Sequence, residues 1–381
     1  MSAHKDRSPL PRLLWLDAMR GISILMIAFF HFLIAYDNGR FPWPLTASSL
    51  PGFVAGCKGD ACWGAPLCAI EGALASLFQR GPHAVAVFIL LSGFGLTYSF
   101  ASMEQPLRRG WPQWYWKRFL RLFPLYWAAH LLYLVSPFIH RQDPVDYRFL
   151  LSMLGDRVYP IATLFYYLNP AWWFFGMLIQ FYLVFPLLFS LLGKAGPVRF
   201  LIGAGLVTIA SRYLLVFVFH AHGNYVQGGF FGARLWEFAA GMALASVYRT
   251  RTRRVTSLLS SWWSLPCGLL VYSLGTYSYR PTIAYTLTDA LIGTGLFLAL
   301  APISASLSAK RLSGTLLGWA GAYSYGIYLF HQPYVMYWGE RLRSLSMPAF
   351  LLCATGILLA IAVASGTIER AIDRLTRPLA R

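Results

Sequence analysis

The sequence predicts an all-α, polytopic integral membrane protein with about ten transmembrane helices and both termini in the cytoplasm. Of its 381 residues, 57% are hydrophobic and only 12% are charged, and the mean hydropathy is +0.53. A soluble domain of this length would need a more charged surface. Three observations support this prediction: the apolar composition, the recurrence of apolar runs, and the uneven distribution of basic residues between these runs.

Ten apolar segments approach the length that a bilayer requires of a helix, which is about 20 residues. The first is too long for the apolar core of a secretion signal and lacks a small-residue cleavage site, so we expect no cleavable leader. We expect residues 1–381 to form one membrane domain, with 37–81 as a long extracytoplasmic loop. The segments are Leu13–Tyr36, Pro82–Ser102, Leu122–Ile139, Trp172–Leu192, Phe200–Phe219, Phe230–Tyr248, Trp262–Tyr277, Ile283–Pro302, Leu316–Trp338 and Met347–Ile368.

Alternate connections differ in their content of lysine and arginine. The two termini and every second connection carry roughly twice as many basic residues as the opposite connections, which assigns them to the cytoplasm. The connection after the sixth segment, for example, holds Arg249, Arg251, Arg253 and Arg254. The net charge of +18 is therefore spread over short loops. No contiguous basic domain is left to bind nucleic acid.

The expected extracytoplasmic loop contains Cys57, Cys62 and Cys68. In an oxidising exterior, two of these cysteines would form a disulfide and leave one thiol; three unpaired cysteines are an equal alternative. Their spacing matches no zinc motif, so we expect no metal site.

Arg20 and His31 lie eleven residues apart within the first apolar segment. Eleven residues make about three turns of helix, so both side chains share one face, separated by about 16 Å along the axis. Charged and titratable groups are costly in hydrocarbon and usually mark a functional site. The alternatives are an arginine that reaches back to the cytoplasmic headgroups and a neutral histidine bonded to a backbone carbonyl.

Four further segments also carry charged or titratable groups. The orientation places Arg212 near the middle of its segment, and the others in the outer half of the membrane. Structural ion pairs are the alternative reading of each group, but five converging segments favour a shared site or water-filled cavity. These residues are Arg212, Arg234, Glu237, Asp289 and His331, of which Arg234 and Glu237 are one turn apart and able to pair.

Arg118 and Arg121 precede the third apolar segment on the cytoplasmic side. We expect them at the start of a helix, where free N–H groups suit phosphate. Ordinary basic flanking of a membrane span also explains them. Because Arg20 approaches the same membrane face, the three arginines favour a polyphosphate ligand.

With these residues in view, the chain resembles the acyltransferase family 3 membrane proteins, which include bacterial O-acetylases of surface polysaccharides. Common nucleotide-binding, serine-hydrolase and zinc-protease motifs do not occur in it. The segments similar to family motifs follow in order: Leu16–Leu25 with Arg20 and His31, Val87–Phe94 with Ser92, Arg118–Pro124, Trp173–Pro186 with Gln180, Arg234–Phe238, and Tyr323–Leu329 with His331 and Pro333.

The resemblance implies an acyl-CoA donor, most commonly acetyl-CoA, and no permanently bound cofactor. The donor would bind from the cytoplasm at Arg20, Arg118, Arg121 and Ser92. His31 would act as general base on a carbohydrate hydroxyl from the outer side, with Arg20 and Glu237 in the catalytic group. Direct transfer and an acyl-histidine intermediate both remain open. The expected supporting or acceptor residues are Arg212, Arg234, Asp289, Tyr325 and His331.

The chain departs from the family pattern at one place. Many members carry acidic residues just before the Gln-Phe-Tyr run, where Leu178 and Ile179 stand here. Two alternatives follow: this chain has no such acid role, or Glu237 takes it. We expect no extra-membrane esterase-like domain of the kind that some longer relatives carry, and we therefore expect transfer to be completed alone or with a partner. We expect a multi-pass protein of a bacterial inner membrane, with its oligomeric state open.

The alternative function is a multi-span transporter or flippase of an envelope glycan or lipid precursor. In that case the same intramembrane charges would line a permeation path. Such a transporter predicts inverted repeats and broken helices in matched halves, and the sequence gives no sign of them.

Overall fold

The computed structural model describes residues 13–46, 48–56, 64–101, 110–141, 143–280, 282–376 and 378. These residues form helices and no strands, as the sequence predicts. Short 3₁₀ or π turns η1 to η6 connect several helices: Gly81–His83, Pro170–Trp172, Leu214–Val218, Tyr225–Gly229, Phe231–Arg234 and Ile283–Leu287. The helices are α1 Leu14–Asp37, α2 Leu50–Gly56, α3 Gly64–Gln79, α4 Ala84–Ala101, α5 Gly110–Val135, α6 Tyr147–Met153, α7 Ile161–Leu164, α8 Trp173–Tyr213, α9 Leu235–Thr250, α10 Thr252–Ser260, α11 Ser264–Tyr277, α12 Thr288–Ser308, α13 Arg311–Ala322, α14 Ser324–Arg341 and α15 Met347–Thr376.

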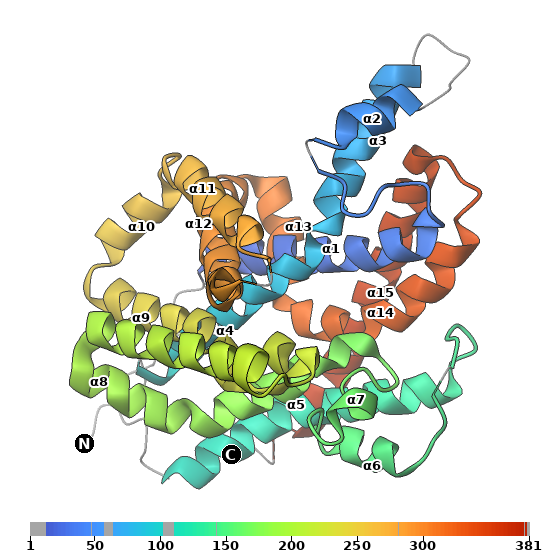
Figure 1. Cartoon of the computed structure of the whole chain (residues 1–381). Coiled ribbons are helices and arrows are strands. Elements are labelled where there is room, and N and C mark those ends of the chain that lie inside the picture. The colour runs from blue at the N-terminus through green and yellow to red at the C-terminus, as the bar shows by residue number, and fades with distance from the viewer. Residues whose placement is uncertain are drawn as a thin grey trace.

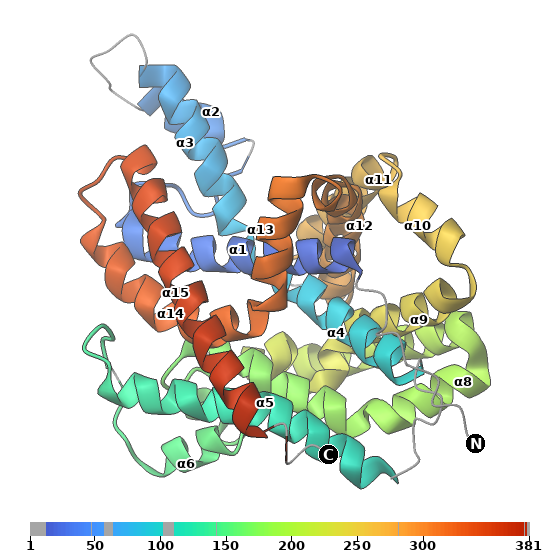
Figure 2. The same ribbon diagram turned by 180° about the vertical axis from the view of Figure 1, so that it is seen from behind.

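Five helical stretches are long and apolar enough to cross a membrane: Leu14–Asp37, Pro66–Ala101, Pro170–Val218, Ile283–Ser308 and Met347–Thr376. These stretches indicate a multi-pass membrane protein. The stretch Pro66–Ala101 has 36 residues, which makes about 54 Å of helix. That length exceeds the bilayer core of about 30 Å. The α2–α3 end accordingly projects from the rest of the bundle (Figures 1 and 2).

Helix α8 accounts for two of the predicted segments, Trp172–Leu192 and Phe200–Phe219. It is not one straight rod, because Gly196 has a non-helical backbone with φ of 75° and Pro197 follows it. Glycine adopts this left-handed conformation without the penalty of a Cβ, and proline then starts a new helical turn. The chain therefore folds back at Gly196, and the two arms of α8 lie beside one another (Figure 1).

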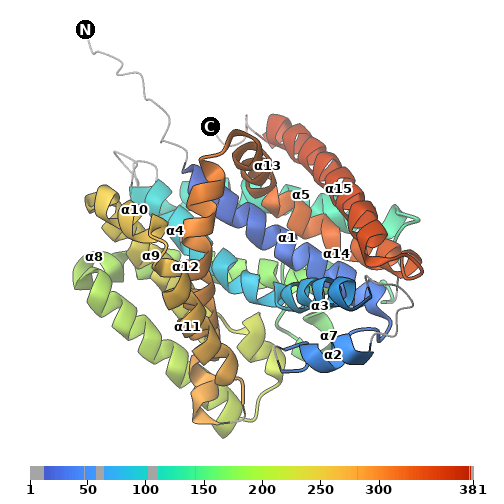
Figure 3. The same ribbon diagram turned by 90° about the horizontal axis from the view of Figure 1, so that it is seen from above.

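Helix α1 runs through the middle of the bundle and contacts α4, α12, α13 and α14 (Figure 3). Two glycines let α13 approach it closely. A Cβ at Gly21 would collide with the backbone of Leu317, and a Cβ at Gly321 with the backbone of Asp17. This close packing fixes the N-terminal half of α1, where Arg20 lies.

Two predicted segments differ from the observed helices. The segment Leu122–Ile139 lies mostly in α5, which begins twelve residues earlier at Gly110 and already ends at Val135. Its first turns are amphipathic and bury Trp114, whose ring stacks on Phe185 at 5.3 Å, so hydropathy alone missed them. The segment Leu316–Trp338 is broken at Tyr323 into α13 and α14. The apolar pattern is continuous across that break and gave no sign of it.

The segment 37–81, expected as a loop, contains helices α2 and α3. Arg40 forms an ion pair with the buried Glu71 of α3, and the Gln79 side chain accepts a hydrogen bond of 2.6 Å from the N–H of Leu45. Cys68 is disulfide-bonded, which favours the paired alternative for the loop cysteines. Cys57 and Cys62 lie outside the described residues.

Candidate active site

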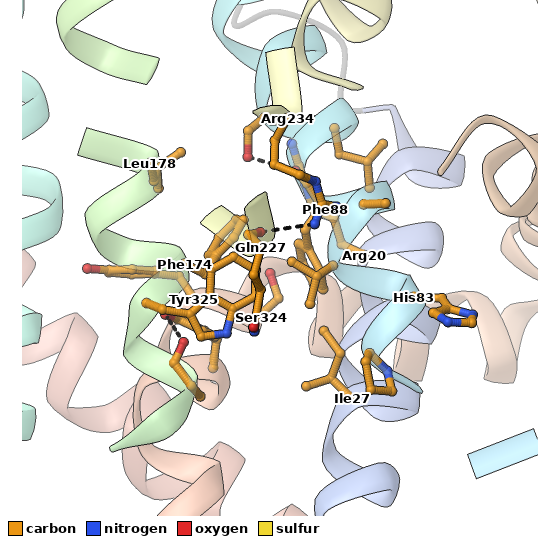
Figure 4. Close-up of a pocket in the computed structure, with 18 of the residues that line it drawn as sticks. Arg20, Ile27, His83, Phe88, Phe174, Leu178, Gln227, Arg234, Ser324 and Tyr325 are labelled. Carbon is orange, nitrogen blue, oxygen red and sulfur yellow. Dashed lines mark hydrogen bonds between the residues drawn. The ribbon is translucent and has the colours of Figure 1, made fainter. Parts of the chain in front are cut away.

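A cavity of about 1240 Å³ lies among the helices and is lined by residues of α1, α4, α5, α8, α12, α14 and α15. Its lining includes Asp17 and Arg20 at one end of α1, and Phe30 and His31 towards the other. Figure 4 shows side chains from several helices turned towards this space. The cavity therefore extends along about three turns of α1.

Arg20 and His31 both line this cavity, as their spacing predicts. The Arg20 side chain retains 30% of its exposure and lies 3.3 Å from the Asp17 carboxylate. Its Nη2 lies close to Gly95 of α4, where an added Cβ would be only 3.1 Å away. Arg20 is thus held in the cavity wall between α1 and α4.

His31 and His331 form a pair whose hydrogen bonds assign their tautomers. Nδ1 of His331 lies 3.1 Å from the Ile327 carbonyl oxygen and 2.9 Å from that of Tyr328. A carbonyl oxygen only accepts, so this nitrogen carries the hydrogen and Nε2 is the acceptor. His31 Nδ1 lies 3.3 Å from that Nε2 and 2.9 Å from the Ile27 oxygen. It therefore donates to both, and Nε2 of His31 is the unprotonated nitrogen.

His331 stands behind His31 as seen from the cavity. It is completely buried, while His31 is the member of the pair that lines the cavity. Their ring centroids are 5.1 Å apart in an edge-on arrangement. Of the two roles expected for His331, the geometry fits support of His31 and does not fit contact with an acceptor.

Arg118 and Arg121 line the same cavity as Arg20. They lie eight and eleven residues after the first residue of α5, so the expected position at a helix N-terminus is wrong. The free N–H groups of a first turn therefore play no part here. The guanidinium of Arg118 packs over the Trp114 ring at 5.3 Å. The positive charge at this end of the cavity comes from the side chains of Arg20, Arg118 and Arg121.

Glu369 of α15 also lines the cavity, and the sequence did not predict it as a site residue. Its Oε2 is buried and has no hydrogen-bond partner. A carboxylate oxygen left in this state costs free energy unless a ligand or water satisfies it. In the sequence, Glu369 belongs to the C-terminal tail, whose basic residues predict a cytoplasmic location. Only its proximity to the arginines in the folded protein marks it as a site residue.

Ser92 and Tyr325 line the cavity as well, but their hydroxyl hydrogens are already used. The Ser92 hydroxyl donates to the Phe88 carbonyl at 2.8 Å. The Tyr325 hydroxyl donates to the Leu122 carbonyl at 2.8 Å, which ties α14 to α5 next to Arg121. Each hydroxyl oxygen still has a lone pair with which to accept a hydrogen bond.

The charged residues Arg212, Arg234, Glu237 and Asp289 form one connected cluster. Nε of Arg234 lies 2.6 Å from Glu237 Oε1, and Asp289 pairs with Arg212 and, at 3.8 Å, with Arg234. Arg212 is the penultimate residue of α8, which continues directly into the π turn Leu214–Val218. Arg234 and Asp289 line the cavity. Glu237 and Arg212 are buried behind them, so Glu237 is placed to hold Arg234 and not to contact a substrate.

Several further lining residues of the cavity were not predicted. They are aromatic side chains and hydrogen-bonding groups from segments with no obvious motif. The Tyr166 hydroxyl donates to the Gln227 side chain at 2.5 Å, and His83 Nδ1 lies 2.6 Å from the Tyr272 hydroxyl. We call this part of the cavity the outer vestibule; its lining includes Trp43, Gln79, His83, Tyr166, Asn224, Gln227, Tyr279 and Tyr285.

The position where family members often carry an acid is apolar in this chain. Leu178 lines the cavity, and Ile179 packs in the hydrophobic core near Phe175. Gln180, directly after them, bonds the backbone of the η4–η5 region: it donates to Gly229 O at 3.1 Å and accepts from Phe231 N at 3.0 Å. Gln180 therefore positions the turn from which Arg234 projects.

The apolar helices and the cavity define a membrane protein with a cavity lined by a histidine and, at one end, by three arginines. The family model described as "Acyltransferase domain", acyltransferase family 3, matches residues 13–367. The chain therefore belongs to this family and is an acyltransferase. No solved structure matches it. Within the residues that the structure describes, no three His, Cys, Asp or Glu side chains gather to hold a metal ion.

Two curated relatives are similar to the chain at modest identity. Acyltransferase MdmB of Streptomyces mycarofaciens is 27% identical over 71% of this chain and 72% of its own length. Peptidoglycan O-acetyltransferase OatA of Listeria monocytogenes is 26% identical over 66% of this chain. The match covers only 44% of OatA, so the chain corresponds to less than half of that protein.

Proposed function

We propose that this acyltransferase moves an acyl group, acetyl in the first instance, from cytoplasmic acyl-CoA to a hydroxyl of a cell-surface carbohydrate or related acceptor. The observation that carries the proposal is the shared cavity. Arginines line one end of it and His31 lines it about three turns further along α1. The names of MdmB and OatA, an acyltransferase and an O-acetyltransferase, support the reaction class.

The donor binds with its phosphates among Arg20, Arg118 and Arg121. Guanidinium groups bind phosphate oxygens through paired, charge-assisted hydrogen bonds. Arg20 and His31 are separated by about 16 Å along α1. An extended thioester-bearing arm held by the arginines then reaches His31. The lone pair of Ser92 and the unpartnered Oε2 of Glu369 are available to accept hydrogen bonds from the donor.

His31 acts as the general base. As the acceptor oxygen attacks the thioester carbonyl, Nε2 of His31 takes the hydroxyl proton. The new C–O bond forms, the C–S bond breaks, and the proton passes from the imidazolium to the departing thiolate. The hydrogen bond from Nδ1 to His331 Nε2 stabilises the imidazolium, since bonds to charged groups are stronger than neutral ones. His331 is therefore a positioning residue.

The acceptor enters through the outer vestibule. Its aromatic rings offer flat apolar faces, and its amides and charged groups offer hydrogen bonds, a combination that suits the faces and hydroxyls of a sugar ring. Arg234 and Asp289 provide one donor and one acceptor group of fixed position. Glu237 and Arg212 hold these two side chains in place from behind.

The proposed reaction crosses the membrane, so its topology is part of the proposal. We propose ten crossings, both termini in the cytoplasm, and a location in the bacterial inner membrane. The basic connections support this orientation. Fusions of a cytoplasm-specific fluorescent reporter after Arg381 should be active. Fusions placed between α14 and α15 should be inactive, and the reverse pattern would overturn the orientation.

Radiolabelled acetyl-CoA supplied to the purified protein tests the chemistry. An enzyme releases free CoA or transfers label without any ion gradient, whereas a transporter consumes no acetyl-CoA. The comparisons give the transporter alternative no support, since both relatives are named as acyltransferases. Mass spectrometry of envelope glycans from a deletion strain identifies the acceptor. A folded His31→Ala variant with full activity would reject the proposed base.

A further inference from the structure

Helix α10 lies at the edge of the helical bundle, between α9 and α11 (Figures 1 and 3). One face of this helix packs against the protein. Val255 is buried in the core cluster that includes Leu16 and Met19 of α1. Leu259, one turn after Val255, packs against the same cluster. Helix α10 is therefore anchored beside the N-terminal half of α1.

The remainder of α10 and the turn after it carry basic and apolar side chains that are exposed. Leu258 is 62% exposed, Trp262 60% and Trp263 80%. Arg254 lies four residues before Leu258, so these two side chains share one exposed face of the helix. We call the following exposed residues the α10 surface: Arg249, Arg251, Arg253, Arg254, Leu258, Trp262 and Trp263.

The protein does not balance the positive charge of the α10 surface. Between Glu237 and Asp289 the chain contains no acidic residue. Within the part of the chain that the structure describes, none of the four arginines forms an ion pair. Like charges at short range repel one another, so an anionic partner would stabilise this group of side chains.

The exposed apolar side chains distinguish a membrane from a soluble anion as that partner. A soluble polyanion would neutralise the arginines but would leave Leu258, Trp262 and Trp263 in water. Tryptophan is enriched where a membrane meets water, and amphipathic helices with arginine, leucine and tryptophan lie in that layer. Clusters of four or more basic residues beside a membrane segment attract anionic lipids. The combination therefore fits the surface of an anionic bilayer.

We propose that the α10 surface binds the headgroups of anionic phospholipids. The lipid phosphates accept hydrogen bonds from the guanidinium groups. Leu258 and the two tryptophans enter the layer between the headgroups and the acyl chains. None of the residues of the α10 surface lines the cavity, so this lipid site is separate from the proposed donor site. Lipid binding there can be measured without any acyl transfer.

The test uses the full-length protein in phosphatidylcholine vesicles that contain a minor share of brominated lipid. Bromine quenches the fluorescence of a tryptophan that it contacts. Subtracting the signal of a variant with Trp262→Phe and Trp263→Phe isolates these two among the 14 tryptophans. The quenching by brominated phosphatidylglycerol, relative to brominated phosphatidylcholine, then gives the lipid preference at the α10 surface.

Each basic residue near an anionic membrane surface contributes about a fivefold preference. We expect the wild-type protein to prefer phosphatidylglycerol at least about tenfold, and Arg253→Gln with Arg254→Gln to lower this preference at least about fivefold. Arg141→Gln with Arg280→Gln is the matched control, because these two exposed arginines lie in other connections. The control should show the preference of the wild type.

Every outcome supports or overturns the lipid site. Equal quenching by the two lipids in the wild type, or quenching by neither, refutes it, as does an equal loss of preference in the control. Added pyrophosphate should leave the quenching unchanged; recovered fluorescence would assign the arginines to a soluble anion instead. If the double variant unfolds, Arg254→Gln alone should lower the preference about fivefold, and an unchanged preference would again refute the proposal.

Discussion

The hydrogen bond between His31 and His331 makes the sharpest prediction. Replacing His331 by leucine removes the acceptor of the Nδ1 hydrogen at 3.3 Å and fills the buried site with an apolar side chain. In the ground state the lost bond joins two neutral rings, and its net value is about 1 kcal/mol. When His31 is an imidazolium the same bond is charge-assisted, and its value rises to about 1.5–3 kcal/mol.

The difference between the two states slows the reaction. That difference is about 0.5–2 kcal/mol and corresponds to about 2- to 30-fold in rate, so we expect kcat to fall by a factor within this range. The KM for acetyl-CoA should not change, because His331 does not line the cavity. His331→Gln keeps an acceptor oxygen and should recover part of the loss. His31→Ala should cost more, about 10²–10⁴-fold.

The assay uses membrane vesicles from a deletion strain that express each variant and receive radiolabelled acetyl-CoA. Label transferred to the envelope glycan fraction gives the rate, and thermal unfolding in detergent checks the fold. His140→Ala is the matched control, since His140 lies at the surface, 3.5 Å from Glu340. Residues that act as one unit are not additive, so His31→Ala with His331→Leu should be no slower than His31→Ala alone. Full activity of His331→Leu, or a multiplicative loss in the double variant, would refute the reasoning.

Three further predictions concern charge and packing. Arg121→Gln should raise the KM for acetyl-CoA several-fold more than Arg199→Gln, which lies outside the cavity; equal effects would contradict the phosphate site. Asp289→Asn leaves two buried arginines with one carboxylate. It should lower the free energy of unfolding, measured in detergent, by about 3–5 kcal/mol. A change below about 1 kcal/mol would contradict the importance of this charged cluster for stability. Gly321→Ala should lower the melting temperature, because its Cβ meets the Asp17 backbone, whereas Gly356→Ala has open space. Equal melting temperatures would show that α13 does not need the close approach.

Several features of the site were legible in the sequence. The eleven-residue spacing of Arg20 and His31 predicted a shared face, and both line one cavity. The prediction of a shared face is reliable because helical periodicity is a local property that does not depend on how the helices pack together. The i, i+3 spacing of Arg234 and Glu237 likewise predicted their pair. The all-helical fold and the family follow from apolar runs and ordered motifs, which are also properties of the chain alone.

The sequence alone thus determined the helices, the membrane class and which ionisable groups the bilayer would force together, since hydrocarbon solvates neither charge nor backbone. Only the tertiary structure decided which of those groups reach the cavity. It put Glu237 and Arg212 behind their partners, brought Glu369 to the arginines, and set His331 against His31, three hundred residues away in the chain. Such contacts depend on how helices cross and where α8 and α13 break, and these are outcomes of packing between distant segments. The apolar pattern of a sequence indicates that a residue is buried, but it does not identify the residues against which that side chain packs.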